Sequence, residues 1–382
     1  MKRKIQFINS YGKFHEYNFI REVLPHDDIT VYSDTGYASF ATAEVEDYYV
    51  KHSINVVKAK DYASIGSGII RKALNLFSGI KIIIKSRSEK YDYCFVHYLS
   101  TRRAVLSLFV PKKTKLVLIT YGSDILRRKN FNNIFFKSML NKADLIVFNS
   151  GNLRYTFEKA YGKKYDEKCV DIAFPCASFK RLELNISKHT KKEAKEHFSL
   201  PLNKTIVVCG HTSTRDEQHK KLIDAIQKID KDHLEQCHFV FPMTYGSEDY
   251  INYRESIKQI LKKTNLSYTV LENYLGYDEM SLLHISSDIH ITSITTDALS
   301  LFLSEELFAG AHLIYGEWLH YTEFEANKVG ADTYKSFNDL PEIISKVIDG
   351  EGTKAPDNQK KIIEDINSND RIAQSWQKYF DR

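Results

Sequence analysis

The sequence predicts an α/β protein built from two doubly wound, Rossmann-like domains. The chain has 382 residues, which exceeds the usual size of one compact domain and fits two of about 150 to 200 residues. Short apolar segments alternate with helical ones, as in parallel sheets that are covered on both faces. The alternation stops around residues 174–178 and then starts again. These observations together predict two consecutive domains.

The first half contains six short apolar segments, bounded by Gly, Pro, Ser or Asp, that we expect to form strands. They lie at residues 4–9, 29–33, 93–97, 115–120, 145–149 and 170–174. The helices expected between them are 17–23, 101–109, 131–140 and 153–161. This series predicts an N-terminal domain over residues 1–185.

A break at Phe174-Pro175-Cys176-Ala177-Ser178 and a charged stretch at 188–197 follow. The pattern then resumes with expected strands at 205–209, 238–242, 268–271, 289–291 and 312–315. The expected helices are 218–229, 251–264, 277–286 and 299–309. We expect a C-terminal domain over 186–368 and, at 369–382, an amphipathic helix that packs across the domain boundary. Since doubly wound sheets bind ligands beyond the carboxyl ends of their strands, the two domains should face a central cleft.

Composition narrows the class of protein. Hydrophobic residues make up 43% and charged residues 27% of the chain, which is typical of globular proteins. No stretch reaches the roughly 20 apolar residues of a membrane span, and the N-terminus does not resemble a signal peptide, so we expect a cytoplasmic protein. The five cysteines lie singly, mostly in apolar segments, which favours buried free thiols over a metal site.

Charge is distributed unevenly along the chain. Residues 1–200 contain 35 Lys and Arg against 20 Asp and Glu, whereas the remainder contains 19 against 29. A basic half indicates an anionic partner, which could be nucleic acid, a membrane or a phosphorylated substrate. No zinc pattern, helix-turn-helix or RNA-binding aromatic motif is present, so we do not expect nucleic acid.

The run from Thr295 to Ile314 carries the most specific candidate site. Asp297 precedes an apolar helix that it could cap, and the N–H groups of Leu299 and Ser300 would then point at a bound diphosphate. Glu305 follows eight residues later, so a helix would bring it to roughly the same face as Asp297. The alternative is a plain capping residue and a solvated helix position.

This spacing resembles the Glu-x7-Glu signature of the retaining GT-B glycosyltransferases, the group typified by phosphatidylinositol mannosyltransferase. The resemblance implies that Asp297 holds the donor sugar and Glu305 the nucleotide ribose. It also implies a metal-independent reaction that needs no cofactor beyond the nucleotide-diphosphate sugar. Asp297 departs from the signature, which has Glu at this position.

A second candidate site follows the strand at 205–209. Gly210, Thr212 and Ser213 would allow close approach of a phosphate, and Arg215 would offer it a bidentate partner. Together with the segment around Tyr245, this turn resembles the bacterial 4-acetamidofucosyl transferases, which extend a lipid-linked saccharide. The alternative for Arg215 is a surface ion pair.

The first half offers a weaker set of candidates. His97 ends a strand, and the segment containing Tyr121, Gly122 and Asp124 resembles the T-x-H-G-x-D segment of the retaining group. His97 and Asp124 are candidate catalytic residues, because a base would be needed if the reaction inverts the sugar. Gly12, Tyr121 and Gly122 are candidates on the acceptor side. A structural role at a strand end is the alternative for His97 and Asp124.

Basic and apolar residues interleave at 69–85 and 126–131. This pattern suits a helix lying on an anionic membrane, which would place the protein peripherally at the inner face of the cell membrane. It equally suits a core helix with a solvated Lys/Arg face.

The sequence therefore predicts a glycosyltransferase that moves a sugar from a UDP- or dTDP-sugar to a lipid-linked or saccharide acceptor in surface polysaccharide synthesis. Two alternatives stay open. A sugar-nucleotide 2-epimerase of the same fold would turn over the nucleotide sugar without an acceptor. A non-catalytic partner subunit, which binds a glycosyltransferase or a glycan, would bind no nucleotide.

Overall fold

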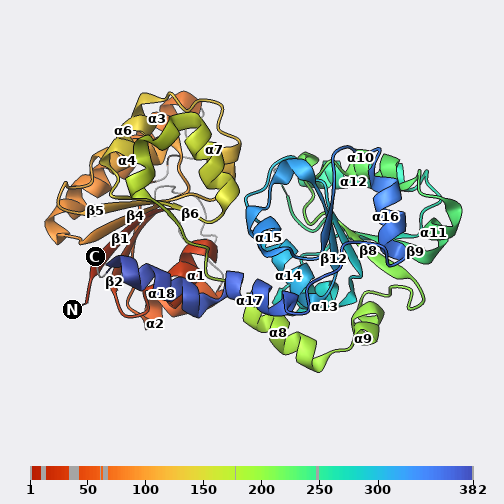
Figure 1. The fold of residues 1–382 in the computed structure, drawn as a ribbon. Helices are drawn as coiled ribbons and strands as arrows, with labels where there is room; N and C mark the ends of the chain where they lie inside the picture. Colours follow the sequence, from red (N-terminus) through yellow and green to blue (C-terminus); the bar gives the residue numbers. More distant parts are fainter. Residues whose placement is uncertain are drawn as a thin grey trace. The chain divides into compact units, whose positions relative to one another are not determined.

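The computed structural model of the chain divides into two compact units (Figure 1). The first unit comprises Met1–Cys176 and Ser368–Arg382, and the second comprises Ala177–Asn367. The structure describes residues 2–9, 14–33, 43–60, 62, 68–176, 178–246 and 249–380. No helix in these ranges is both long enough and apolar enough to cross a bilayer.

The first unit is a seven-stranded parallel sheet in the order β3-β2-β1-β4-β5-β6-β7. Its strands are β1 (Lys4–Asn9), β2 (Asp28–Ser33), β3 (Asn55–Lys58), β4 (Tyr93–His97), β5 (Lys115–Ile119), β6 (Leu145–Phe148) and β7 (Cys169–Asp171). Its α-helices are α1 (Phe14–Val23), α2 (Ala43–Lys51), α3 (Gly68–Lys85), α4 (Thr101–Leu108), α5 (Ser123–Leu126), α6 (Ile134–Lys142), α7 (Gly151–Tyr161) and α18 (Asn369–Phe380). Short 3-10 turns lie at Ser86–Glu89 and Gly162–Lys168.

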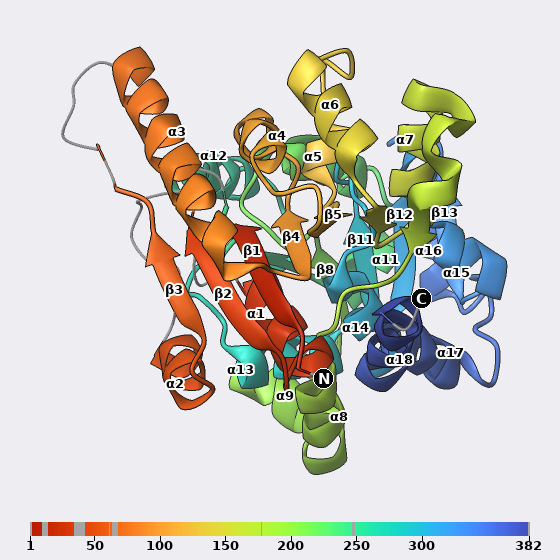
Figure 2. The same cartoon turned by 90° about the vertical axis from the view of Figure 1, so that its left-hand side faces the viewer.

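Helices cover both faces of this sheet, with α1, α2 and α18 on one side and α3, α4 and α6 on the other (Figure 2). Two covered faces explain why β4 is apolar at nearly every position and buried throughout. An aromatic cluster joins the sheet to α1 and α18, in which the rings of Phe19 and Trp376 lie 4.9 Å apart. The C-terminal helix is therefore part of the first unit's core.

The second unit is a six-stranded parallel sheet in the order β10-β9-β8-β11-β12-β13. Its strands are β8 (Thr205–Cys209), β9 (Cys237–Pro242), β10 (Tyr268–Leu271), β11 (Ile289–Thr292), β12 (His312–Gly316) and β13 (Ala331–Tyr334). Its α-helices are α8 (Ser178–Lys188), α9 (Lys191–His197), α10 (His219–Ile226), α11 (Lys231–Gln236), α12 (Tyr250–Leu261), α13 (Tyr277–Ser286), α14 (Leu301–Ala309), α15 (Thr322–Asn327), α16 (Leu340–Ile348) and α17 (Gln359–Asn367). Short 3-10 turns lie at Arg215–Glu217 and Glu317–Leu319.

The predicted fold class of two doubly wound α/β domains is confirmed, with all eleven expected strands in place. The division between the units differs from the expected one at 185/186, because that point falls inside α8. This helix belongs to the second unit, where Phe179 and Leu182 join its core. The charged stretch at 188–197 contains α9, whose Thr190 and Glu193 form a capping box.

Candidate functional site

The second sheet reverses its strand order between β8 and β11. From β8 the order runs outward through β9 and β10, and from β11 it runs the other way through β12 and β13. The loops that leave β8 and β11 lead to helices on opposite faces of the sheet, α10 on one and α14 on the other. Open α/β sheets form a crevice at such a point, beyond the carboxyl ends of the strands. The candidate donor residues lie in these loops.

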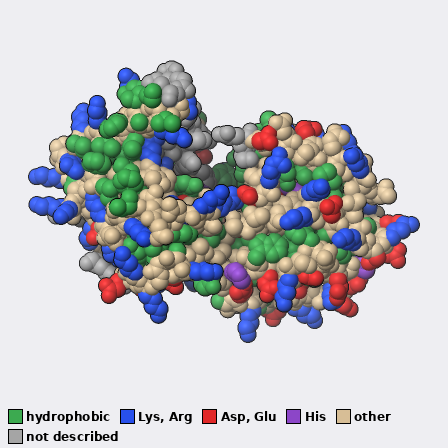
Figure 3. All heavy atoms as spheres, turned by 90° about the horizontal axis from the view of Figure 1, so that it is seen from above, with side chains coloured by type: hydrophobic (Ala, Val, Ile, Leu, Met, Phe, Trp, Pro, Cys, Tyr) green, Lys and Arg blue, Asp and Glu red, His purple; other side chains and the backbone are tan. Residues whose placement is uncertain are grey.

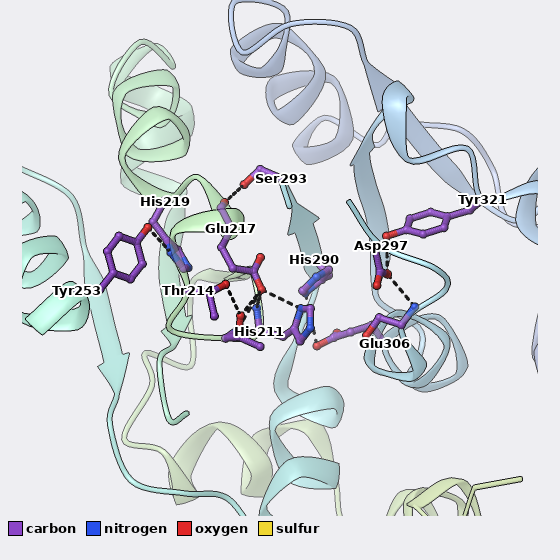
Figure 4. A network of polar contacts seen from close by, with 12 residues as sticks. His211, Thr214, Glu217, His219, Tyr253, His290, Ser293, Asp297, Glu306 and Tyr321 are labelled. Carbon is purple, nitrogen blue, oxygen red and sulfur yellow. Dashed lines mark hydrogen bonds and ion pairs between the residues drawn. The ribbon is translucent and has the colours of Figure 1, made fainter. Parts of the chain in front are cut away.

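The turn after β8 closes around a buried carboxylate, Glu217 (Figure 4). One of its oxygens, Oε1, accepts the backbone N–H of His211 at 3.3 Å and that of Thr212 at 3.1 Å. It also accepts the Thr212 hydroxyl at 2.9 Å, and His211 Nδ1 lies 3.1 Å away. Three donor groups of the turn thus point inward. The expectation that Thr212 faces a phosphate is corrected, because Glu217 already satisfies its N–H and hydroxyl groups.

Ser213 is also directed inward. Its side chain is fully buried, with its hydroxyl donating to the carbonyl of Tyr250 at 2.9 Å and its N–H to that of Tyr245 at 2.6 Å. The close packing of these two segments also requires glycine at position 246, since a Cβ on Gly246 would come within 2.4 Å of the Ser213 carbonyl oxygen. The β8 turn and the segment after β9 therefore form one packed unit, and the Ser213 hydroxyl is not available to a ligand.

Gly210 has a conformational and a steric reason to be glycine. Its φ is +68°, and a Cβ there would lie 2.8 Å from Glu217 Oε2 and 3.1 Å from His219 Nε2. We predict that Gly210→Ala lowers the free energy of unfolding by about 2 to 4 kcal/mol, from left-handed strain plus the clash. Gly350→Ala is the matched control, because its φ is +76° and nothing lies within 4 Å. Urea unfolding of both variants checks this, and equal losses would contradict a steric role for Glu217.

Asp297 lies in the loop after β11, outside helix α14. Its Oδ2 accepts the N–H of Ser300 at 2.8 Å and the hydroxyl of Tyr321 at 2.9 Å (Figure 4). Burial raises the pKa of this carboxyl above its usual range, although a neighbouring His211 and these two hydrogen bonds oppose the rise. Helix α14 begins at Leu301, two residues later than expected. The N–H of Ser300 is therefore occupied, which corrects its expected contact with a diphosphate.

The first N–H groups of α14 differ from that of Ser300. Those of Leu301 and Phe302 have no hydrogen-bond partner among the described residues. They carry the positive end of the helix dipole at the same sheet edge as the β8 turn. The N–H of Leu299 likewise has no hydrogen-bond partner among these residues, while its side chain packs against the core under α14. In the part of the chain that the structure describes, the N–H groups without an internal acceptor at the start of α14 are thus those of Leu299, Leu301 and Phe302, and of the two expected donors only Ser300 is occupied.

Glu305 is buried and paired. Its Oε1 accepts the hydroxyl of Ser178, and its Oε2 lies 3.1 Å from Nε2 of His284. The other nitrogen of His284, Nδ1, lies 3.0 Å from Oε1 of Glu306. Because Asp297 lies outside the helix, the expected common helical face with Glu305 does not exist. Both oxygens of Glu305 take part in an internal network with Ser178 and His284, and the ribose contact that the resemblance implies for Glu305 stays a prediction.

This network makes stability depend on pH. Burial disfavours the charge on His284, but Glu306 and Glu305 outweigh it and raise its pKa to about 9. The unfolded chain releases this proton near pH 6.5, whereas the folded chain keeps it until about pH 9. The stabilisation is therefore complete below pH 6.5 and lost as pH rises through 9.

We predict that the free energy of unfolding falls by about 1.4 kcal/mol per pH unit between about pH 7 and 8.5. Urea titrations across this range check the slope. The slope should largely disappear in His284→Gln and persist in His52→Gln, whose exposed imidazole stacks on the ring of Tyr48. A wild-type slope unchanged in His284→Gln would contradict a shared proton at His284.

Arg215 and Tyr245 are the two predicted donor residues whose side chains are exposed. The Arg215 guanidinium lies 3.4 Å from an oxygen of Asp249 and over the ring of Tyr253, and Tyr245 is 45% exposed. An exposed ion pair of this kind contributes little stability and exchanges easily. The surface pairing anticipated as the alternative for Arg215 is present, and the side chain remains accessible to an anion.

In the first unit, His97 is fully buried at the end of β4. Its Nδ1 lies 2.6 Å from the Tyr121 hydroxyl, and its ring packs among Phe7 and Phe19. Burial and the nearby charge of Arg103 hold the pKa of His97 well below its usual value, so the ring is neutral. The expectation that His97 lies at the edge of a cleft is therefore corrected, since an acceptor cannot reach it.

Asp124 organises the loops beyond β4 and β5. Its Oδ1 accepts the N–H groups of Tyr121 and Gly122 at 3.0 Å, and its Oδ2 accepts that of Leu99 at 2.8 Å. Gly122 has a φ of +132°, which allows this tight turn. Asp124 also borders a cavity of about 290 Å³. Its lining is mostly polar and includes the cations Arg128 and Lys129 together with Tyr98, Ser100, Thr101 and Asn133. The predicted N-terminal residues thus meet at one sheet edge. Gly12 lies outside the described residues.

Several residues of the second site were not anticipated, namely Glu217, His211, His284, Glu306 and Tyr321. One of them left a signal in the sequence, because the adjacent acids Glu305 and Glu306 occur inside the apolar run LFLSEELFA and require a buried partner. No group of three or more His, Cys, Asp or Glu side chains suited to a metal ion occurs in the part of the chain that the structure describes.

The two-unit architecture is similar to several solved structures. HepE from Anabaena in complex with UDP aligns over 99% of both chains, with a TM-score of 0.70 and 16% identity. A glycosyltransferase from Rickettsia africae aligns over 99% and 98% of the chains, with a TM-score of 0.70 and 16% identity. Sucrose-phosphate synthase from Thermosynechococcus elongatus aligns over 99% and 98%, with a TM-score of 0.74 and 10% identity.

The chain has the GT-B fold. HepE was also solved with UDP-glucose, at a TM-score of 0.69 to this chain. No protein-family profile and no curated protein sequence matches the chain. The relationship is therefore visible in the GT-B architecture and not in the sequence as a whole.

Proposed function

We propose that the chain is a glycosyltransferase that binds a UDP-sugar in its second unit and transfers the sugar to a lipid-linked or saccharide acceptor bound by its first. The observation that carries the proposal is the polar edge of the second sheet at the β8–β11 reversal. It supports nucleotide binding because such crevices bind nucleotides in doubly wound sheets. The likeness to HepE, which was solved with UDP and UDP-glucose, favours UDP over the dTDP that the sequence also allows.

The donor diphosphate would bind the N–H groups of Leu301 and Phe302 and the guanidinium of Arg215. These groups would stabilise the negative charge that develops on the leaving UDP. Asp297, at the same edge, would hold a hydroxyl of the donor sugar. The buried Glu217 would act indirectly, by fixing the turn that carries Arg215.

The acceptor would bind in the cavity of the first unit, with Arg128 and Lys129 facing its phosphate or acidic groups. If the reaction inverts the sugar, Asp124 would take the acceptor proton, because it borders this cavity. The resemblance of the Asp297–Glu305 run instead favours a retaining, metal-independent reaction without a cofactor. The anomeric configuration of the product, read by NMR, distinguishes the two outcomes.

Thermal-shift measurements with UDP, dTDP and GDP test the proposal. A ligand at about 100 times its Kd stabilises the folded state by about 2.7 kcal/mol. We expect UDP to raise the melting temperature most. Turnover of UDP-sugar without an acceptor would instead indicate a 2-epimerase. Failure of all three nucleotides to stabilise the chain would contradict the proposal and favour a non-catalytic subunit.

Arg215→Ala is predicted to weaken UDP binding by about 10- to 100-fold, because a charge-assisted bidentate contact is lost. The melting temperature of the unliganded protein should not change, since Arg215 is exposed. Lys346→Ala, which removes an exposed cation paired with Glu342 on α16, is the control and should bind UDP normally. Equal UDP affinity in wild type and Arg215→Ala, measured by calorimetry, would exclude this contact.

A further inference from the structure

The outward face of helix α3 is apolar. This 18-residue helix buries only Asn75, Gly79 and Ile83. On the solvent side, Ile70, Phe77 and Ile84 are 54%, 62% and 44% exposed, and their spacing of seven residues places them on one stripe. Lys72, Lys81 and Lys85 are exposed as well, so α3 has the solvated cations that a core helix would present. Beside them, large apolar side chains also face solvent along the length of α3.

Helix α6 extends this surface. Ile134 and Phe135 at its start are 72% and 44% exposed. Helix α4 packs against both α3 and α6, and the Gly79 backbone allows a close approach of α3 to Leu106 of α4. Figure 3 shows this face of the first unit, where apolar side chains lie among Lys and Arg. We call the surface formed by α3 and the start of α6 the α3/α6 face.

The charge of this face has one sign. Residues 68–88 contain no Asp or Glu, whereas Arg71, Lys72, Lys81, Lys85 and Arg87 fall in the same stretch. Arg127, Arg128 and Lys129 precede α6 in the chain. Exposed bulky apolar groups flanked by cations match the boundary between anionic headgroups and acyl chains. A second copy of the same face fits poorly, because its cations would meet those of the first.

We propose that the α3/α6 face docks the first unit on an anionic lipid bilayer. The apolar stripe enters the headgroup boundary and the Lys and Arg side chains contact lipid phosphates. The cavity at Asp124 adjoins this face, because Asn133 lines the cavity and Ile134 follows it in the chain. The inference rests on the proposed function only in this respect: a lipid-linked acceptor would reach the cavity from the membrane.

Vesicle co-sedimentation tests the proposal with the full chain. The protein should bind vesicles that contain phosphatidylglycerol, bind phosphatidylcholine vesicles much less, and dissociate as salt rises. Phe77→Glu combined with Ile134→Glu should reduce binding at least about tenfold, and Lys72→Glu with Lys81→Glu by about fivefold or more per side chain. Leu202→Glu is the control, because Leu202 is 49% exposed in the second unit.

Three outcomes would overturn the proposal. They are absence of vesicle binding by the wild type, binding that these variants leave unchanged, and a dimer in gel filtration that Phe77→Glu dissociates. Each variant is also melted with and without UDP, which verifies folding. A normal UDP response with no vesicle binding would reject the docking face alone, whereas vesicle binding without a UDP response would reject the proposed donor site alone.

Discussion

Glu217→Ala is expected to lower the free energy of unfolding by about 3 to 5 kcal/mol and to weaken UDP binding. The substitution leaves the N–H groups of His211 and Thr212 and the Thr212 hydroxyl without their buried acceptor. Each unsatisfied group costs about 1 to 3 kcal/mol, and they share one carboxylate. The turn that presents Arg215 would loosen. Urea unfolding and UDP calorimetry on the same preparation measure both effects.

Two variants control this experiment. Glu217→Gln keeps one acceptor oxygen and the side-chain volume, so it should lower the free energy of unfolding by an intermediate amount. Glu342→Ala removes an exposed carboxylate that pairs with Lys346, and it should change stability by less than about 0.5 kcal/mol. If Glu217→Ala lowered the free energy of unfolding no more than Glu342→Ala does, the Glu217 carboxylate would not hold the turn in place.

His284→Leu is expected to lower the free energy of unfolding by a similar amount, about 3 to 5 kcal/mol. The imidazole lies between Oε2 of Glu305 and Oε1 of Glu306, and removing it leaves two buried carboxylates close together without their common partner. Chemical unfolding measures the loss. The variant should also bind UDP more weakly, because α14 supplies the proposed phosphate-binding N–H groups.

A double-mutant comparison separates the free-energy cost of removing the carboxylates' hydrogen-bond partner from the cost of changing the side-chain volume at position 284. His284→Leu combined with Glu306→Leu removes one of the uncompensated carboxylates, so it should be more stable than His284→Leu alone. Additive destabilisation by the two substitutions would mean that His284 and Glu306 do not interact energetically.

The strands and their order in the sequence were predictable, because each is a short apolar run between residues that favour turns. Edge elements were harder to predict. Strand β3 (Asn55–Lys58) has only two central apolar residues, and it is partly exposed at the rim of the sheet. Helix α8 combines apolar and charged residues, so the sequence did not show that it packs in the second unit.

The sequence identified polar residues for the candidate sites but did not predict the directions in which their side chains point. Small hydroxyl residues after Gly210 are compatible with a phosphate outside the turn or a carboxylate inside it, and only the fold brings Glu217 beneath them. From the sequence, Asp297 could accept a backbone N–H either at the start of the helix or from a loop before it. In the structure Asp297 lies in the loop before the helix, and α14 begins only at Leu301.

Amide hydrogen exchange with and without UDP tests the donor site at the β8–β11 reversal, because it locates the binding site within the chain. We expect UDP to slow exchange in residues 210–218 and 293–303, the loops after β8 and β11, and most strongly at Leu301 and Phe302. Residues of the first sheet should change little. Protection confined to other segments, or none with UDP in excess, would contradict a donor site at the β8–β11 reversal.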